Sequence, residues 1–408
     1  MSDSPRRLLA VATLWGEAHV ERWARASRRT LASPGNLPAL AKAGHATSLH
    51  LFTDRASAAL LAERAAPLDA HAEIRVHAFE DTPFDGSTLA ARVQGLGDAR
   101  MKNRLNVDTV GWTIDCALQD GANAAVLALD NDFLLADGAL ADAVATLDRG
   151  PRAVMVPTLR LAQERTGWTA QEGVPESGLS VADLCGRLPD ALHPVSRALD
   201  VDGAEFSSYP ASMLWRAGDA GWLCRSFLPH PLAFVPNPAR RRSASTVDYC
   251  FALQMHPEPG ALALPAAGDR VRVFKLTPER AHDGGGSGRA LDDARLLTFL
   301  YFFTNRAHRA LALQPVWLPA RGGDGGDARR EAEARSQAML ERWFAMVDRQ
   351  SAKLPLGAHA ELWQRSHYGS IDEFLCPSRL SEAMRRDPSL AQLLARLGLG
   401  LGSAAVSR

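Results

Sequence analysis

The sequence predicts an α/β protein with a mostly parallel sheet flanked by helices and a helical appendage at the C-terminal end. Three observations carry this prediction. Short apolar or β-branched runs alternate with longer stretches of helical period up to about residue 160. A glycine-rich break at 321–327 separates the first part of the chain from its C-terminal part. Beyond the break, residues 328–350 place Met339, Trp343 and Val347 on one helical stripe.

The composition is that of an ordinary globular protein. Of the 408 residues, 46% are hydrophobic and 23% are charged, and the formal net charge is +0, so nothing points to nucleic acid or an acidic membrane as partner. The five cysteines form no C-x-x-C pair, which argues against a disulfide framework or a zinc ribbon. No signal peptide and no apolar run long enough to cross a bilayer are present. We therefore expect a cytoplasmic protein without a transmembrane segment.

The predicted elements alternate along the chain. Apolar runs predict strands at 8–16, 47–54, 73–81, 124–132 and 152–159. Helical periodicity predicts helices at 20–31, 55–66, 103–119 and 135–147, with Asp54 and Asp137 placed to cap the second and the fourth. From 160 to about 230, polar and proline-containing segments predict loops that carry a binding surface. Two further short helices are expected within 377–398.

The motif Asp130-Asn131-Asp132 ends the fourth of these strands. Side chains alternate along a strand, so we expect the two carboxylates to point the same way and Asn131 to point the opposite way. Adjacent carboxylates repel each other unless a cation lies between them, and Mg²⁺ or Mn²⁺ commonly binds one or two carboxylates together with substrate phosphates. The motif therefore predicts a metal-diphosphate site. The alternative is that these residues only turn the chain, as Asp and Asn often do.

In this context the sequence resembles the nucleotide-sugar glycosyltransferases of the GT-A fold, in which a D-x-D motif after about the fourth strand holds the metal and the diphosphate. The resemblance covers roughly residues 8–160. More narrowly, the chain resembles a group of bacterial GT-A-like proteins that share an S/A-P-G-N-L-P-A-L segment, here SPGNLPAL at 33–40, and that likeness reaches about residue 280. The resemblance implies a Rossmann-like sheet and a sugar-nucleotide donor.

The resemblance assigns nucleotide-binding roles to residues that follow the early strands. Thr13, Trp15 and Gly16 at the end of the first strand would hold the nucleotide, with Trp15 stacking on the base. Thr53 and Asp54 would contact the ribose or the base, although capping alone accounts for Asp54. Asp130 would contact the donor. Either of the two basic residues before the 103–119 helix, Lys102 and Arg104, could bind a phosphate, with Arg104 the better fit.

The C-terminal half supplies the remaining candidates. His230 is the candidate third metal ligand beside Asp130 and Asp132, or alternatively a residue that shapes a proline-flanked loop. Asp248 is the candidate general base for the acceptor hydroxyl, although Ser245 and Asp248 also have the spacing of a capping box. The basic run 240–242 would offset the charge of the departing diphosphate or simply be solvated.

We therefore expect a glycosyltransferase, hexosyltransferase-like, that moves a sugar from a nucleotide-diphosphate donor to a glycan, lipid-linked or protein acceptor with the help of Mn²⁺ or Mg²⁺. The expected organisation is a catalytic domain at 7–320, divided into a nucleotide-binding half at 7–160 and an acceptor half at 161–320, followed by a helical region at 327–408. Two alternatives stay open. One is a sugar-phosphate nucleotidyltransferase, although the stretch after the first strand lacks the glycine-rich, arginine-containing loop of that class; the other is a non-catalytic binding or scaffold domain.

Overall fold

The computed structural model describes residues 5–121, 123–168, 173–207, 209–238, 247, 251–252, 255–256, 258, 260–266, 268–280, 289–293, 296–297, 299–300, 304, 306–320 and 325–351. The chain divides into two compact units. The first contains Met1–His193, Pro229–Ala281 and Leu318–Asp324, and the second contains Pro194–Leu228, His282–Trp317 and Gly325–Arg408. Residues 194–228 and 282–317 therefore group with the C-terminal part of the chain and not with the large sheet.

The first unit is built on a seven-stranded sheet with the order β13-β8-β12-β6-β1-β2-β3. Its strands are β1 (Arg7–Thr13), β2 (Ala46–Thr53), β3 (Glu73–Ala78), β6 (Ala124–Ala128), β8 (Ala153–Val156), β12 (His230–Phe234) and β13 (Leu262–Ala263). β1 is parallel to β2 and β6, β2 is parallel to β3, and β13 is parallel to β8. Only β12 runs antiparallel to its neighbours β6 and β8. The predicted mostly parallel α/β sheet is confirmed.

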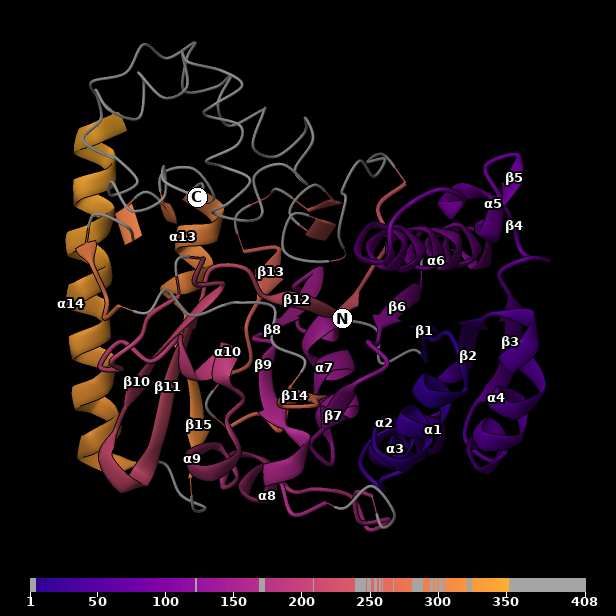
Figure 1. Cartoon of the computed structure of the whole chain (residues 1–408), viewed down its shortest axis with the longest axis horizontal. Coiled ribbons are helices and arrows are strands. Elements are labelled where there is room, and N and C mark those ends of the chain that lie inside the picture. Colours follow the sequence, from indigo (N-terminus) through magenta and orange to yellow (C-terminus); the bar gives the residue numbers. More distant parts are fainter. Residues whose placement is uncertain are drawn as a thin grey trace. The chain divides into compact units, whose positions relative to one another are not determined.

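Continuous apolar runs form the centre of this sheet. Every residue of β6 is buried, and so is β1 from Leu8 onwards. Such runs are typical of parallel strands that are covered on both faces. Helices cover both faces of the sheet because the crossover connections between parallel strands are right-handed. The connections from β1 to β2 to β3 run in one direction across the sheet, and the connection from β3 to β6 runs in the other, so their helices lie on opposite faces. Figure 1 shows α6 on one side of these strands and α1 to α4 on the other.

Among the described residues of the first unit, the helices are short, with one exception. They are α1 (Glu17–Arg25), α2 (Ser27–Leu31), α3 (Leu37–Lys42), α4 (Ala58–Ala65), α5 (Leu89–Val93), α6 (Asp98–Asp120), α7 (Ala139–Asp148), α8 (Val181–Cys185) and α9 (Leu188–Ala191). Single-turn helices lie at Arg55–Ser57, Ala66–Leu68 and Gln163–Arg165, and a small hairpin pairs β4 (Pro83–Phe84) with β5 (Ser87–Thr88). The 23 residues of α6 contain the predicted 103–119 helix.

Two sequence expectations about the helices need correction. The single helix expected at 20–31 is broken at Ala26, whose backbone is not helical, and continues as α2. Asp137 does not cap α7, because the N-cap is Gly138 with a left-handed φ of 88°. The Asp137 carboxylate instead accepts a hydrogen bond of 2.6 Å from the backbone N–H of Gly35. The expected cap at Asp54 is confirmed, since its side chain accepts the Ser57 N–H at 2.9 Å.

A second sheet of the first unit has the order β7-β14-β9 and begins directly downstream of the acidic motif in the chain. Its strands are β7 (Phe133–Leu135), β9 (Leu159–Ala162) and β14 (Val273–Thr277). β14 is antiparallel to β7 and parallel to β9, so Lys275 lies opposite both Phe133 and Arg160. This register brings a lysine from the second half of the chain beside residues that follow β6.

The second unit contains a three-stranded sheet and a long helix. Its elements are α10 (Pro194–Arg197), β10 (Ser212–Arg216), a single turn at Gly218–Ala220, β11 (Gly221–Ser226), α13 (Arg306–Ala312), the first two residues of β15 (Val316–Pro319) and α14 (Gly326–Ser351), with the sheet order β10-β11-β15. The helix predicted at 328–350 is confirmed as α14, and Trp343 and Val347 of the predicted stripe are buried. The strands β10 and β11 stand where loops were expected.

The buried Arg225 on β11 shows how the second unit satisfies a charged group inside its core. Its guanidinium donates to the Ser336 hydroxyl at 3.0 Å and to the carbonyls of Leu313 and Glu333 at 2.5 and 3.3 Å. These contacts tie β11 to α14 and to the segment after α13. The helices expected within 377–398 lie outside the described residues. Among the described helices, none is long and apolar enough to span a bilayer.

Two histidines contact each other where β2 pairs with β3: His50 is buried and His77 is half-buried. His50 Nδ1 and His77 Nε2 share a hydrogen bond of 3.0 Å, and both rings contact Trp112. Burial lowers the pKa of His50 from 6.5 to about 3. The nearby His77, Arg75 and Arg7 lower this pKa further, and the Glu73 carboxylate acts in the opposite direction. Burial and Arg75 lower the pKa of His77 to about 4. The unfolded chain therefore binds more protons than the folded chain between these values and pH 6.5.

We expect the thermal stability of the protein to fall as the pH drops from 7 to 5, because the unfolded state takes up the additional protons. The double variant His50→Asn/His77→Asn keeps polar groups in place but cannot titrate, so its melting temperature should change less over the same range. Calorimetry at both pH values measures the two slopes. Equal slopes for both proteins would contradict the role of this pair.

Candidate functional site

The acidic motif lies where the strand order of the large sheet reverses. Along the chain the sheet grows from β1 to β2 to β3, and β6 then returns to the other side of β1. Ligands of open α/β sheets bind outside the carboxyl ends of the strands at such a point. Asp130, Asn131 and Asp132 follow β6, and Trp15 and Gly16 follow β1. The topology therefore places the motif at the edge where a ligand is expected.

Hydrogen bonds fix the backbone of the motif against β1 and α2. The Asn131 amide donates to the Thr13 carbonyl at 3.1 Å, and the Ser27 hydroxyl donates to the Asn131 carbonyl at 3.0 Å. The backbone N–H of Leu129 bonds to the Val11 carbonyl at 2.9 Å. The asparagine of the motif is thus a structural residue, and the two aspartates are the members that can meet a ligand.

The SPGNLPAL segment holds the chain immediately after the motif. Asn36 is fully buried, and its amide donates to the carbonyls of Thr30 and Ala136 at 2.8 and 3.0 Å, while its Oδ1 accepts the Leu140 N–H at 2.9 Å. A Cβ on Gly35 would lie 2.5 Å from the backbone nitrogen of Gly138, so only glycine fits there. This segment therefore has a structural role: it fixes the chain that leaves β7.

Lys275 is the residue at this site that the sequence analysis missed. Its Nζ forms an ion pair and hydrogen bond with Oδ2 of Asp130 and lies 5.4 Å from the centre of the Phe133 ring. The two partner side chains are only 19% and 21% exposed, so the pair is largely shielded from solvent. The signal in the sequence was a single lysine within an apolar strand, VFKLT, in a chain with only four lysines among its 46 basic residues.

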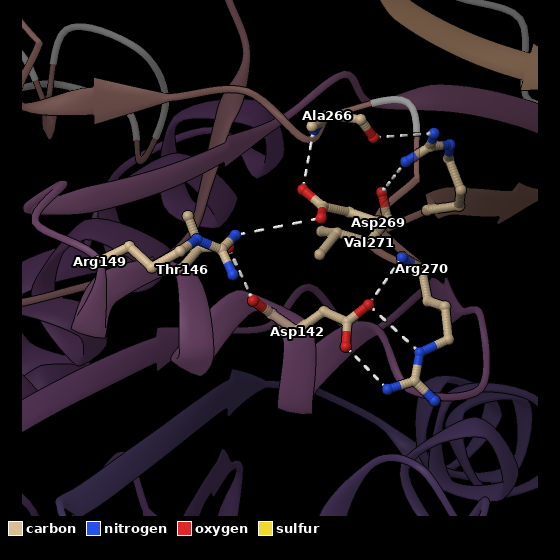
Figure 2. Close-up of polar contacts among 8 residues, drawn as sticks. Asp142, Thr146, Arg149, Ala266, Asp269, Arg270 and Val271 are labelled. Atoms are coloured by element: carbon tan, nitrogen blue, oxygen red, sulfur yellow. Dashed lines mark hydrogen bonds and ion pairs between the residues drawn. The ribbon is translucent and has the colours of Figure 1, made fainter. Parts of the chain in front are cut away.

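A hydrogen-bond network anchors the segment that leads into β14 (Figure 2). The Asp142 carboxylate on α7 accepts two bonds from the Arg270 guanidinium, at 2.7 and 3.2 Å, and one from the Arg270 backbone N–H at 2.8 Å. Asp269 accepts the Ala266 N–H at 2.8 Å. Because α7 is itself held by Asn36, the network places β14 and hence Lys275 in a fixed relation to the motif.

Burial and ion pairing shift the pKa values of Asp130 and Lys275 in opposite directions, and ion pairing has the larger effect on both. Burial acts to raise the pKa of Asp130, but the Lys275 ammonium and His230 outweigh it and hold that pKa well below its usual range. Burial likewise acts to lower the pKa of Lys275, and the carboxylates of Asp130 and Asp132 outweigh it and raise that pKa. Asp130 and Lys275 are therefore both ionised at neutral pH.

Asp132 is in a different electrostatic environment from Asp130. Burial raises the pKa of Asp132, and Asp130 adds to this shift, while Lys275, Lys102 and Arg160 oppose it. The site thus combines one ion-paired carboxylate and one carboxyl group whose pKa is raised, with further positive charge from Lys102 and Arg160 in reach.

His230 lies at the site but makes no hydrogen bond there. It is the first residue of β12, so the antiparallel direction of this strand brings it to the carboxyl ends of β6 and β8. Its Nε2 is 3.8 Å from Oδ1 of Asp130, and neither ring nitrogen has a partner. Burial lowers its pKa to about 4, so the ring is neutral at pH 7 and can donate or accept one bond to a ligand.

The residues predicted at the end of β1 surround the same edge. Both oxygens of the Asp54 carboxylate accept backbone N–H groups, one from Ser57 and one from Gly16 at 2.6 Å. Gly16 has a φ of 75°, which favours glycine. Trp15 is half-buried, with its ring 4.9 Å from that of His19. Asp54 therefore shapes the loop that carries Trp15 and the start of α1.

The other predicted phosphate and nucleotide contacts are engaged within the protein. The hydroxyls of Thr13 and Thr109 share a buried hydrogen bond of 2.7 Å. Arg104 is paired with Asp108 at 2.8 Å, and Arg92 binds the same carboxylate at 2.6 Å. Lys102 is exposed and lies within electrostatic range of Asp130 and Asp132. Of these basic residues, Lys102 is the one that the structure brings near the motif.

Two cavities that share part of their lining lie in the first unit. Both are lined by Arg22 of α1, Gln163 and Trp168. The smaller, of about 140 Å³, also includes Leu276, the neighbour of Lys275, and the larger, of about 480 Å³, includes Arg280. The cavities therefore offer an aromatic side chain and arginines within the same unit as the acidic motif.

The residues at the site do not form a ligand set for a divalent cation as they are arranged. No group of three or more His, Cys, Asp or Glu side chains in the described part of the chain could hold a metal ion. One oxygen of Asp130 already binds an ammonium group, and Lys102 and Arg160 add positive charge. This field favours an anion over a further cation. Metal binding by Asp130, Asp132 and His230 stays a prediction.

Two further predictions lie outside the described residues. These are the candidate base Asp248 and the basic run 240–242.

Comparison with known proteins identifies similar solved structures but no related family or curated protein. No family model matches the chain, and no curated protein matches it at a significant level. Among solved structures, the chain is similar to the mannosyltransferase PcManGT from Pyrobaculum calidifontis in complex with GDP-Man and Mn²⁺, at 13% identity, over 97% of this chain and 87% of that chain, with a TM-score of 0.35. This TM-score is too low to infer an activity from the neighbour, so any inference about function depends on the residues of the site.

We expect Asn36→Ala to lower the free energy of unfolding by about 2 kcal/mol or more, because buried backbone groups of Ala136 and Leu140 would lose their partner. Chemical denaturation of the variant measures this loss. Lys42→Ala, at an exposed position on neighbouring α3, serves as the control and should cost little. Equal stability of Asn36→Ala and the wild type would contradict the structural role of the segment.

Proposed function

We propose that the protein is a glycosyltransferase that takes a sugar from a nucleotide-diphosphate donor and transfers it to an acceptor. The observation that carries this proposal is the position of Asp130 and Asp132 after the fourth strand of the large sheet in chain order, at the point where the strand order reverses. Positive groups gather at the same edge, as binding of a diphosphate requires. Lys275 pairs with Asp130, and Lys102 and Arg160 lie within electrostatic range of Asp132.

In this proposal the loop after β1 receives the nucleoside. Trp15 is half-buried and offers a ring face, and Asp54 fixes the loop through Gly16. The diphosphate then lies over the ends of β1 and β6, near the start of α1. This arrangement assigns Asp54 an indirect role, as a residue that positions the nucleotide-binding loop.

The acceptor would occupy the cavities next to Leu276. Their combined lining of Trp168, Gln163 and arginines suits a polar acceptor that has an apolar face, such as a sugar. The acceptor class, whether glycan, lipid-linked or protein, is left open. The predicted base Asp248 would take the proton of the attacking hydroxyl.

A donor-hydrolysis screen tests the proposal. UDP-, GDP- and CDP-sugars are incubated with wild type and with Asp132→Ala, each with EDTA and with Mn²⁺, and free sugar is measured. We expect sugar release by the wild type with at least one donor and a loss of about 100-fold or more in Asp132→Ala, because the Asp132 carboxylate would stabilise the positive charge that develops at the anomeric carbon. Asp69→Ala, at an exposed position remote in sequence from the motif, is the matched control and should keep full turnover.

The two alternative functions give different results in the same assay. A sugar-phosphate nucleotidyltransferase would release pyrophosphate from a nucleoside triphosphate and a sugar phosphate and would not hydrolyse the donor. A scaffold domain would neither bind nor turn over any of these compounds. Equal turnover by wild type and Asp132→Ala would remove the motif from the mechanism.

A further inference from the structure

The ion pair with Asp130 holds the ammonium group of Lys275 next to the acidic motif. The ammonium group of Lys275 carries three N–H donors, of which one bonds to Asp130. The carboxylate therefore holds the ammonium in place and leaves two donors for other acceptors. The Lys275 side chain is not fully buried, since 19% of it is exposed. A lysine ammonium is a compact point charge, which suits a phosphate group.

The surroundings of Lys275 favour a ligand with negative charge. Phe133 covers one side of the ammonium, and Arg160 lies opposite Lys275 on β9. His230 faces Asp130 with both ring nitrogens unpartnered, which leaves it one donor or acceptor for the same ligand. A buried polar ring without a partner is costly unless a ligand satisfies it. An ammonium group and an imidazole ring thus both lie next to the Asp130 carboxylate.

We propose that Lys275 does the work usually given to a divalent metal, so that the protein binds its donor diphosphate and transfers the sugar without Mg²⁺ or Mn²⁺. This inference rests on the proposed glycosyltransferase function and names the cation of that site. Asp130 is then a positioning residue that holds Lys275, and Lys275 is the catalytic residue that contacts the diphosphate.

The transfer step is balanced without a further reactant. The bond between the anomeric carbon and the β-phosphate oxygen breaks, and its electron pair stays on that oxygen. The acceptor oxygen forms the new bond to the anomeric carbon, and its proton passes to a general base. The diphosphate leaves with one more negative charge, which the Lys275 ammonium stabilises without giving up a proton.

Isothermal titration with UDP, GDP and CDP tests this inference, with each titration done in EDTA and again in Mn²⁺. We expect the wild type to bind at least one of these nucleoside diphosphates in EDTA, with an affinity that Mn²⁺ changes by less than about threefold. Lys275→Met should weaken binding in EDTA by about 10- to 100-fold, since a charge-assisted bond is lost. Mn²⁺ should restore part of that loss, because Asp130 is then free to bind a metal.

Two controls keep the result interpretable. Lys42→Met makes the same chemical change at an exposed site and should bind as the wild type does. Lys275→Met leaves Asp130 without its partner in a shielded position, which can destabilise the fold. The charge-neutral double variant Asp130→Asn/Lys275→Met avoids that penalty and should bind weakly in EDTA without rescue by Mn²⁺.

The outcomes separate this inference from the proposed function. Wild-type binding that disappears in EDTA and returns with Mn²⁺ overturns the role of Lys275 and leaves the glycosyltransferase proposal standing. No binding of any nucleoside diphosphate in either buffer overturns both. The wild-type comparison decides between these results even if the lysine variants do not fold.

Discussion

The ion pair between Asp130 and Lys275 is the interaction on which the site depends. It joins the end of β6 to β14, two segments that are 145 residues apart in the sequence. An ion pair that is mostly shielded from water is stable only when both charges are held in good geometry, and loss of either partner leaves the other uncompensated. The hydrogen bonds of Asn36 and the Asp142–Arg270 clamp therefore have one common effect: they hold the two strands that carry this pair.

The protein separates structural polar groups from those available to a ligand. Asn36, Asn131 and Asp54 use their side chains on backbone groups and fix three loops at the carboxyl edge of the large sheet. The apolar strands β1 and β6 supply the rigid floor beneath them. Among the described residues at this edge, the groups left for a ligand are Asp132, His230 and the remaining N–H donors of Lys275. A preorganised arrangement of this kind is needed for electrostatic stabilisation of a leaving group.

The sequence was a good guide where structure is local and a poor one where it depends on distant partners. Apolar runs identified five of the seven strands of the large sheet, but not β12 and β13. The Asp54 cap was found because its partner is three residues away. Asp137 was misread because its partner, Gly35, is 102 residues away. The break at Ala26 and the role of Lys275 were missed for the same reason. The strands β10 and β11 are no shorter than β6, which was found, but they lie among polar and proline-containing segments that were interpreted as loops.

The most direct measurement is a crystal structure grown with a nucleoside diphosphate and Mn²⁺ together, with anomalous data collected for manganese. The account predicts the β-phosphate within about 3 Å of Lys275 Nζ, the Lys275–Asp130 bond intact and no anomalous peak at Asp130. A manganese ion between Asp130 and the diphosphate, with Lys275 displaced, would contradict it.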